Sequence, residues 1–269
     1  MRFVICPLYQ EAAPLIERMQ LRPAGTCVRH PVYEGEDIRL FLCGYGSLEA
    51  AASVSAFLGR SAATERDWYF LYGSAAGITC DDGIYQLNRI HSLDSGRDYY
   101  PSLYLDLPSA SVTCGSTVLK DNREGISSDL YDMESDGILQ AFSLFADDSH
   151  RLLLRFVSDT GKGEISPKML QDVSSSYAGT FIDAMDALVP LVTSVESSIL
   201  WTKEDQRLED QLADHLHASI TMRRRLHQLL IYARASHQDL SSFGNLQAKD
   251  RAEGKEMLHE LSDRLAAKI

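Results

Sequence analysis

Carboxyl groups in one stretch of the chain are placed where they could transfer protons. Asp132 and Glu134 lie within a helical pattern, and the apolar run 152–157 that follows ends at Ser158 and Asp159. The run predicts a buried strand that presents Asp159 at its C-terminal end, where open α/β sheets bind their ligands. A carboxyl group in such a crevice can give or accept a proton. The simpler alternative is that Asp159 only caps the next segment, because Asp and Ser are common in caps and turns.

A fourth carboxyl group, that of Glu11, follows the first apolar run of the chain. Residues 2–6 predict a strand, and residues 11–19 show the helical spacing of apolar side chains. Glu11 is therefore expected at the C-terminal end of a strand and at the start of a helix. An acid in a first helical turn can also simply complement the helix dipole.

Two loops made of small residues follow other predicted strands. The run 38–43 leads into Gly-Tyr-Gly-Ser at 44–47 and then into a small-residue helix, 48–58. The run 68–72 leads into Gly-Ser-Ala-Ala-Gly-Ile at 73–78. Because glycine and alanine have little or no side chain, a flat ring or another ligand can approach the backbone closely there. A tight turn, or close packing of a strand on a helix, explains the same residues without a ligand.

Other elements must hold these groups in place. Short apolar runs alternate with helical spacing up to about residue 192, which predicts an α/β unit. The expected pieces are a hairpin of 32–33 with 38–43, strands at 83–90 and 111–113, a loop at 95–101 that exposes Tyr99 and Tyr100, and closing helices over 165–192. From residue 195 the spacing is only helical, so we expect domains 1–194 and 195–269, the second a helical hairpin.

Four features in this order resemble the purine nucleoside phosphorylase and 5'-methylthioadenosine/S-adenosylhomocysteine nucleosidase superfamily. They are the first strand with its Glu-bearing loop, the small-residue turn at 73–78, Asp-Met-Glu-Ser at 132–135 and Val-Ser-Asp at 157–159. The resemblance covers residues 1 to about 192. It implies a three-layer α/β sandwich with a central mixed, twisted sheet, and an enzyme that needs no metal and no cofactor.

The resemblance also implies roles for individual residues. Asp159 matches the acid that protonates N7 of a purine, Glu11 matches the group that deprotonates the attacking water, and Glu134 with Met133 matches the group that holds the ribose hydroxyls. The other expected substrate contacts are Gly46, Ser74, Ala75, Val118 and Ser158. Many family members stack an aromatic side chain on the base at the position of Val118, so the chain departs from the pattern there.

The implied reaction is hydrolysis of the N-glycosidic bond of a purine nucleoside, and a 5'-modified adenosine is the expected substrate. Phosphorolysis is an alternative that needs cations for the phosphate dianion, but the loops at 7–10 and 44–47 contain none. Arg39 and Arg97 could still reach the site from elsewhere. A catalytically inactive nucleoside-binding or scaffold protein is a third alternative, which the presence of the proton donor Asp159 argues against.

Composition limits the partners. The chain has 269 residues and a net charge of −12, and residues 200–269 hold 11 basic and 11 acidic side chains, so the whole excess lies in residues 1–199. Such a surface opposes binding to nucleic acid, and a small molecule is the expected partner. The five cysteines form no C-x-x-C pair and predict free thiols of a reducing compartment. No apolar run is long enough for a signal peptide or a membrane span, so a cytoplasmic protein is expected.

Two surface features carry further expectations. The nucleosidases that the chain resembles are dimers, and Tyr99, Tyr100 and Tyr104 offer aromatic surface for a subunit contact, so a homodimer is expected. The run of three arginines at 223–225 is either a patch for phosphate or an acidic surface, or a solvated helix face balanced by nearby acids.

Overall fold

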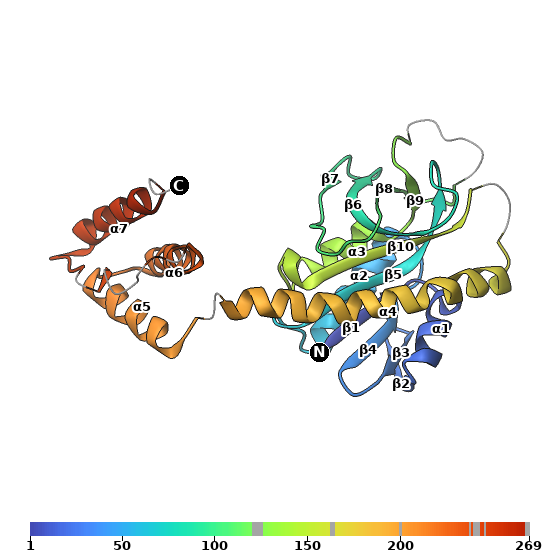
Figure 1. Cartoon of the computed structure of the whole chain (residues 1–269), viewed down its shortest axis with the longest axis horizontal. Coiled ribbons are helices and arrows are strands. Elements are labelled where there is room, and N and C mark those ends of the chain that lie inside the picture. Colours follow the sequence, from blue (N-terminus) through green and yellow to red (C-terminus); the bar gives the residue numbers. More distant parts are fainter. Residues whose placement is uncertain are drawn as a thin grey trace. The chain divides into compact units, whose positions relative to one another are not determined.

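The computed structural model describes residues 1–119, 126–161, 165–198, 201–236, 238, 243–244 and 246–266 (Figure 1). The chain divides into two compact units, Met1–Val192 and Thr193–Ile269. The first unit is a mixed α/β structure and the second is helical. Among the described residues, no helix is both long enough and apolar enough to cross a membrane.

A 10-stranded mixed sheet forms the centre of the first unit. Its strands are β1 (Arg2–Cys6), β2 (Arg22–Cys27), β3 (His30–Glu34), β4 (Ile38–Leu42), β5 (Trp68–Gly77), β6 (Ile84–Ser92), β7 (Asp98–Tyr99), β8 (Ser109–Cys114), β9 (Leu130–Asp132) and β10 (Arg151–Asp159). The strand order is β10-β6-β8-β9-β5-β1-β4-β3-β2, and β7 pairs with β6 outside this order. Because β10 also pairs with β5, the strands β5, β9, β8, β6 and β10 form a closed ring.

Helices cover both faces of this sheet, which confirms the predicted three-layer sandwich. They are α1 (Tyr9–Arg18), α2 (Ser47–Arg60), α3 (Ser135–Phe142) and α4 (Pro167–Ser198). Side chains alternate along β1, so that Phe3 and Ile5 pack with α2 and α3 while Val4 and Cys6 pack with α1 and α4. Each face therefore has its own apolar core.

Parallel pairing brings several strand ends to one edge of the sheet. Strand β1 lies between β4 and β5, β5 also pairs with β10, and all of these pairs are parallel. The C-terminal ends of β1, β5 and β10 therefore lie together, and the loops that follow them meet there. This is the edge at which the acidic residues were expected.

Several elements differ from the sequence-based prediction. Strand β5 continues through residues 73–77, which were predicted to be a turn, because β10 and β9 pair with these residues. Asp132 ends β9 and Glu134 is the N-cap of α3, so neither lies inside a helix. The closing segment is one long helix, α4, which begins at Pro167 as expected for a first-turn proline.

Other differences concern the surface. Strand β2 was not predicted, since its side chains are mostly exposed and give no apolar run. In the predicted aromatic loop only Tyr100 is exposed, because Tyr99 belongs to β7 and packs against the core. Tyr104 is also partly buried. All five cysteines are free, and four of them are buried.

The second unit contains three described helices, one more than a hairpin. They are α5 (Lys203–His215), α6 (Ile220–Ala235) and α7 (Arg251–Ala266). The side chains of Thr202 and Ser219 cap α5 and α6 by accepting hydrogen bonds from Asp205 N and Met222 N. An apolar core that includes Leu226 and Leu261 holds the helices together, so the unit has a core of its own.

Candidate active site

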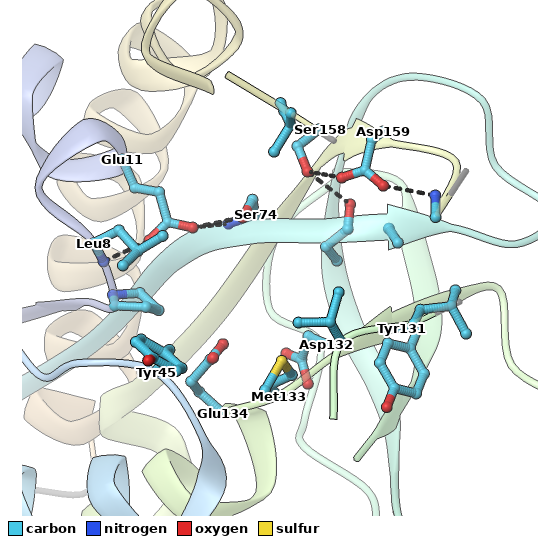
Figure 2. A pocket seen from close by; sticks show the side chains of 17 residues that line it. Leu8, Glu11, Tyr45, Ser74, Tyr131, Asp132, Met133, Glu134, Ser158 and Asp159 are labelled. Carbon is cyan, nitrogen blue, oxygen red and sulfur yellow. Dashed lines mark hydrogen bonds between the residues drawn. The ribbon is translucent and has the colours of Figure 1, made fainter. Parts of the chain in front are cut away.

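A pocket of about 460 Å³ lies at the sheet edge where β1, β5 and β10 end (Figure 2). This size is within the range of small-molecule sites. It is lined by Pro7, Leu8, Glu11, Tyr45, Ser74, Ala75, Ala76, Val118, Leu119, Tyr131, Asp132, Met133, Glu134, Ser158, Asp159, Gly161 and Ile165. Every residue predicted to contact the substrate is therefore in the lining except Gly46. The N–H group of Gly46 donates a hydrogen bond to Glu134, which is in the lining.

Glu11 is held at the pocket by the start of α1 and by β5. Its carboxylate accepts hydrogen bonds from Leu8 N at 2.8 Å, from Ser74 N at 2.8 Å and from Ser74 Oγ at 2.6 Å. The residue is almost fully buried, and this burial raises the pKa of Glu11 although Arg155 and the hydrogen bonds act against the rise. A carboxylate with a raised pKa is a stronger base than an exposed one.

Glu134 faces Glu11 across the pocket (Figure 2). Its Oε1 accepts a hydrogen bond from Gly46 N at 3.1 Å, and its Oε2 accepts one from Arg155 Nη2 at 3.1 Å. Gly46 has a φ of 93°, which a residue with a side chain adopts only under strain, so the turn before α2 favours glycine there. The pKa of Glu134 is raised to about 7, mainly by burial. Arg155 acts against this rise, whereas the nearby carboxylates of Asp132 and Glu11 add to it.

Asp159 stands at the opposite end of the pocket from these two acids (Figure 2). Its Oδ2 accepts a hydrogen bond from Ser158 Oγ at 2.7 Å and its Oδ1 accepts one from Gly161 N at 2.6 Å. The carboxyl group closes a turn after β10, as the capping alternative requires. It also lines the pocket, so capping and a chemical role are compatible.

Arg155 is a buried residue beside the site that the sequence analysis missed. It lies in the middle of β10, inside a run interpreted as apolar, and its side chain is fully buried. Its Nη2 lies 2.7 Å from Asp132 Oδ2 and 3.1 Å from Glu134 Oε2, and its Nε donates to Ser135 Oγ at 3.1 Å. A single arginine in an otherwise apolar strand was the available signal, since a buried cation needs an anionic partner.

Gly73 provides the space for this arginine. Gly73 is paired with Arg155 across the β5–β10 ladder. A Cβ atom at Gly73 would lie 2.3 Å from Arg155 Nη1, so a side chain at this position would force the buried guanidinium to shift. The small residues of β5 therefore accommodate Arg155 as well as lining the pocket.

The rest of the lining is mainly apolar. Met133 and Ala75 belong to this lining, and Val118 is largely exposed, as expected of a residue at the margin of the pocket. Tyr131, which was not predicted, supplies an aromatic wall below Asp159 (Figure 2). Its hydroxyl donates to Thr117 O at 2.6 Å, which fixes the ring. No group of three or more His, Cys, Asp or Glu residues in the described part of the chain could hold a metal ion.

No protein-family model matches the chain, and no curated protein matches its sequence. Solved structures do match it. A mutant futalosine hydrolase of Helicobacter pylori has a TM-score of 0.57 and 10% identity, over 69% of this chain and 98% of that one. A mutant 5'-methylthioadenosine/S-adenosylhomocysteine nucleosidase (MTAN) of the same species was solved with 5'-methylthioadenosine in the active site. It has a TM-score of 0.57 and 9% identity, over 69% of this chain and 97% of that one. The 5'-methylthioadenosine nucleosidase of Arabidopsis thaliana has a TM-score of 0.58 and 13% identity, over 70% and 95%.

These likenesses establish the fold. Over about 70% of its length, the chain shares its fold with these two nucleosidases and the futalosine hydrolase.

Proposed function

We propose that the chain is a nucleosidase that hydrolyses the N-glycosidic bond of a purine nucleoside, and that its substrate is a 5'-modified adenosine. The observation that carries the proposal is that Glu11, Glu134 and Asp159, from three separate segments, line one pocket. Cleavage of such a bond needs a proton for the departing base, a base for the attacking water and a means to hold the sugar. Three carboxyl groups with different surroundings can divide these tasks.

Asp159 serves the base end of the pocket. Its two hydrogen bonds from Ser158 and Gly161 fix the carboxyl group in one orientation. When the C1'–N9 bond breaks, its electron pair passes to the purine, and Asp159 delivers the proton that N7 takes up. Tyr131 is near enough to this end of the pocket to offer its ring to the base, which compensates for the aliphatic Val118.

Glu11 and Glu134 serve the sugar end. Glu134, held by Gly46 N and Arg155, accepts hydrogen bonds from the two ribose hydroxyls. Glu11 takes the proton of the water whose oxygen attacks C1', and its raised pKa suits this role. The sum of the steps is the addition of one water molecule to give free base and free sugar.

Hydrolysis rather than phosphorolysis is the reaction that the charges of the pocket favour. No lysine or arginine is among the residues found to line it, whereas a phosphate dianion requires such groups or helix N-termini. We therefore expect purified protein to release adenine from 5'-methylthioadenosine or a related nucleoside at the same rate with and without phosphate. Release that depends on phosphate and yields ribose 1-phosphate would contradict the proposal.

The choice of substrate is tested in the same assay. 5'-Methylthioadenosine, S-adenosylhomocysteine, 5'-deoxyadenosine, adenosine and inosine are compared, and futalosine is included because a futalosine hydrolase shares the fold. We expect an adenosine with an altered 5' position to have the highest kcat/KM. Binding of these nucleosides without any release of base would instead favour an inactive binding protein.

The pH dependence tests the part played by Glu134. Its pKa of about 7 means that the carboxyl group is increasingly protonated below this pH and then loses its capacity to accept both ribose hydroxyls. We expect kcat/KM to fall by up to about tenfold per pH unit below pH 7. Glu134→Gln should raise KM and lower kcat/KM roughly 10- to 100-fold at pH 8, since a hydrogen bond to a charged group contributes about 1.5–3 kcal/mol. The acid limb near pH 7 should be absent from this variant, and its persistence would exclude Glu134 as its source.

A homodimer is part of the proposal. Tyr45 is exposed at the pocket, Leu48 is exposed in the first turn of α2, and Tyr100 is exposed on another loop. Exposed aromatic and large apolar side chains are typical of subunit contacts. We expect light scattering to give twice the chain mass of 30.0 kDa, and Leu48→Glu to shift the mass toward the monomer. A mass of 30.0 kDa for the unmodified chain at assay concentration would contradict this expectation.

A further inference from the structure

A second cavity, of about 270 Å³, lies within the helical unit between α6 and α7. Its floor is apolar and consists of the buried side chains of Met222 and Leu258. Its walls carry three side chains with nitrogen donors: Arg225 from α6, and Lys255 and His259 from α7. Lys255 and His259 are one helical turn apart, so they lie on the same face of α7.

Hydroxyl groups and a helix terminus complete the lining. Thr221 and Ser262 supply hydroxyls, and Arg225 Nη2 donates a hydrogen bond to Ser262 Oγ at 2.9 Å. Thr221 and Met222 belong to the first turn of α6, a helix of 16 residues with no acid in that turn. The positive end of the helix dipole therefore adds to the charge of the side chains. Guanidinium, ammonium and imidazole groups with hydroxyls form the donor set that binds phosphate in proteins.

The arginine and the lysine of this cavity differ from two other arginines of the unit, which form ion pairs. Arg223 pairs with Asp214 at 2.9 Å, and Arg234 pairs with Asp205 at 3.0 Å. Within the described residues, Arg225 and Lys255 form no ion pair. The sequence suggested a balanced arginine run, but the balance extends to Arg223 and not to the arginine that lines the cavity. Two cations without an ion pair, Arg225 and Lys255, thus lie together at a concave site.

We propose that this cavity binds a phosphate monoester, with Arg225, Lys255 and His259 as its ligands and the hydroxyl of Ser262 as a further donor. The phosphate group belongs either to a phosphorylated side chain of a partner protein or to a small phosphorylated metabolite. Both sources present the same dianion to the same donors. All residues of this site lie in the second unit, and none of them takes part in the proposed nucleosidase reaction.

Calorimetric titration of the full-length protein tests the proposal with three probes: inorganic phosphate, glycerol 3-phosphate and a phosphoserine peptide with its unphosphorylated form as a blank. We expect saturable binding that weakens at least tenfold in Arg225→Gln. Arg224→Gln is the matched control, since Arg224 is the adjacent exposed arginine on α6 and does not line the cavity. It should change the affinity by less than twofold. Lys255→Gln provides a second test variant if Arg225→Gln does not fold.

The outcomes separate the possibilities. Tighter binding of the phosphopeptide identifies a protein partner, and tighter binding of glycerol 3-phosphate identifies a metabolite. Equal weakening by Arg224→Gln and Arg225→Gln would show a diffuse electrostatic effect and overturn the proposal. Binding that survives both Arg225→Gln and Lys255→Gln, or the absence of saturable binding by every probe, would also overturn it.

Discussion

Replacing Asp159 by Asn is expected to lower kcat by about two orders of magnitude or more, while folding and nucleoside binding largely persist. General acid catalysis typically contributes 10²- to 10⁴-fold. The amide retains the shape of the side chain. Its oxygen can still accept the hydrogen bond from Gly161 N, and its NH2 group can donate one to Ser158 Oγ, but it cannot deliver a proton to the departing base. Steady-state kinetics give kcat, and calorimetry with the nucleoside gives the affinity.

The same variant separates the chemical role from the structural one. If Asp159 only capped the turn after β10, Asn would be nearly silent, since Asn caps about as well as Asp. Asp147→Asn is a suitable control, because Asp147 is exposed, lies just before the other end of β10 and makes no side-chain cap. We expect this control to keep normal activity. Near-normal kcat in Asp159→Asn would remove Asp159 from the mechanism.

Replacing Arg155 by Met is expected to lower the free energy of unfolding by about 3–5 kcal/mol at neutral pH. This is the usual effect of removing one partner from a buried ion pair, because the remaining charge is left without compensation. Here two buried carboxylates, those of Asp132 and Glu134, would lose their cation. Because Arg155 lowers the pKa of Glu134, this pKa should rise in the folded variant, so the deficit should be smaller at low pH, where Glu134 is protonated in the folded and the unfolded states.

Two companion variants make this prediction specific. Arg89→Met removes an arginine from a partly exposed ion pair, in which Arg89 Nε lies 3.1 Å from Asp98 Oδ1. We expect the free energy of unfolding to fall by at most about 1 kcal/mol. The triple variant Asp132→Asn, Glu134→Gln and Arg155→Met removes the whole charged cluster and should recover most of the stability. Denaturant unfolding at two pH values measures all three proteins. A loss in Arg155→Met no larger than that in Arg89→Met would show that the buried cluster is not held by its arginine.

The chemical groups of the pocket could be identified from local patterns. Glu11 and Asp159 each stand next to a run of buried apolar residues, and this contrast is visible in a few consecutive letters. The strands of the core were recognisable for the same reason. The alternation of strand and helix was enough to predict an α/β sandwich, because each element must bury one apolar face.

The contacts that hold those groups depend on residues far apart in the chain. Gly46 and Glu134, which share a hydrogen bond, are separated by 88 positions, and Glu11 and Ser74 by 63. Such pairs leave no local signal, and the same holds for the pairing of β5 with β10 that places Gly73 beside Arg155. Arg155 itself was overlooked because its burial and its partners exist only once β9, β10 and α3 have come together. Local sequence therefore indicates which groups can react, whereas long-range strand pairing decides which charges surround them.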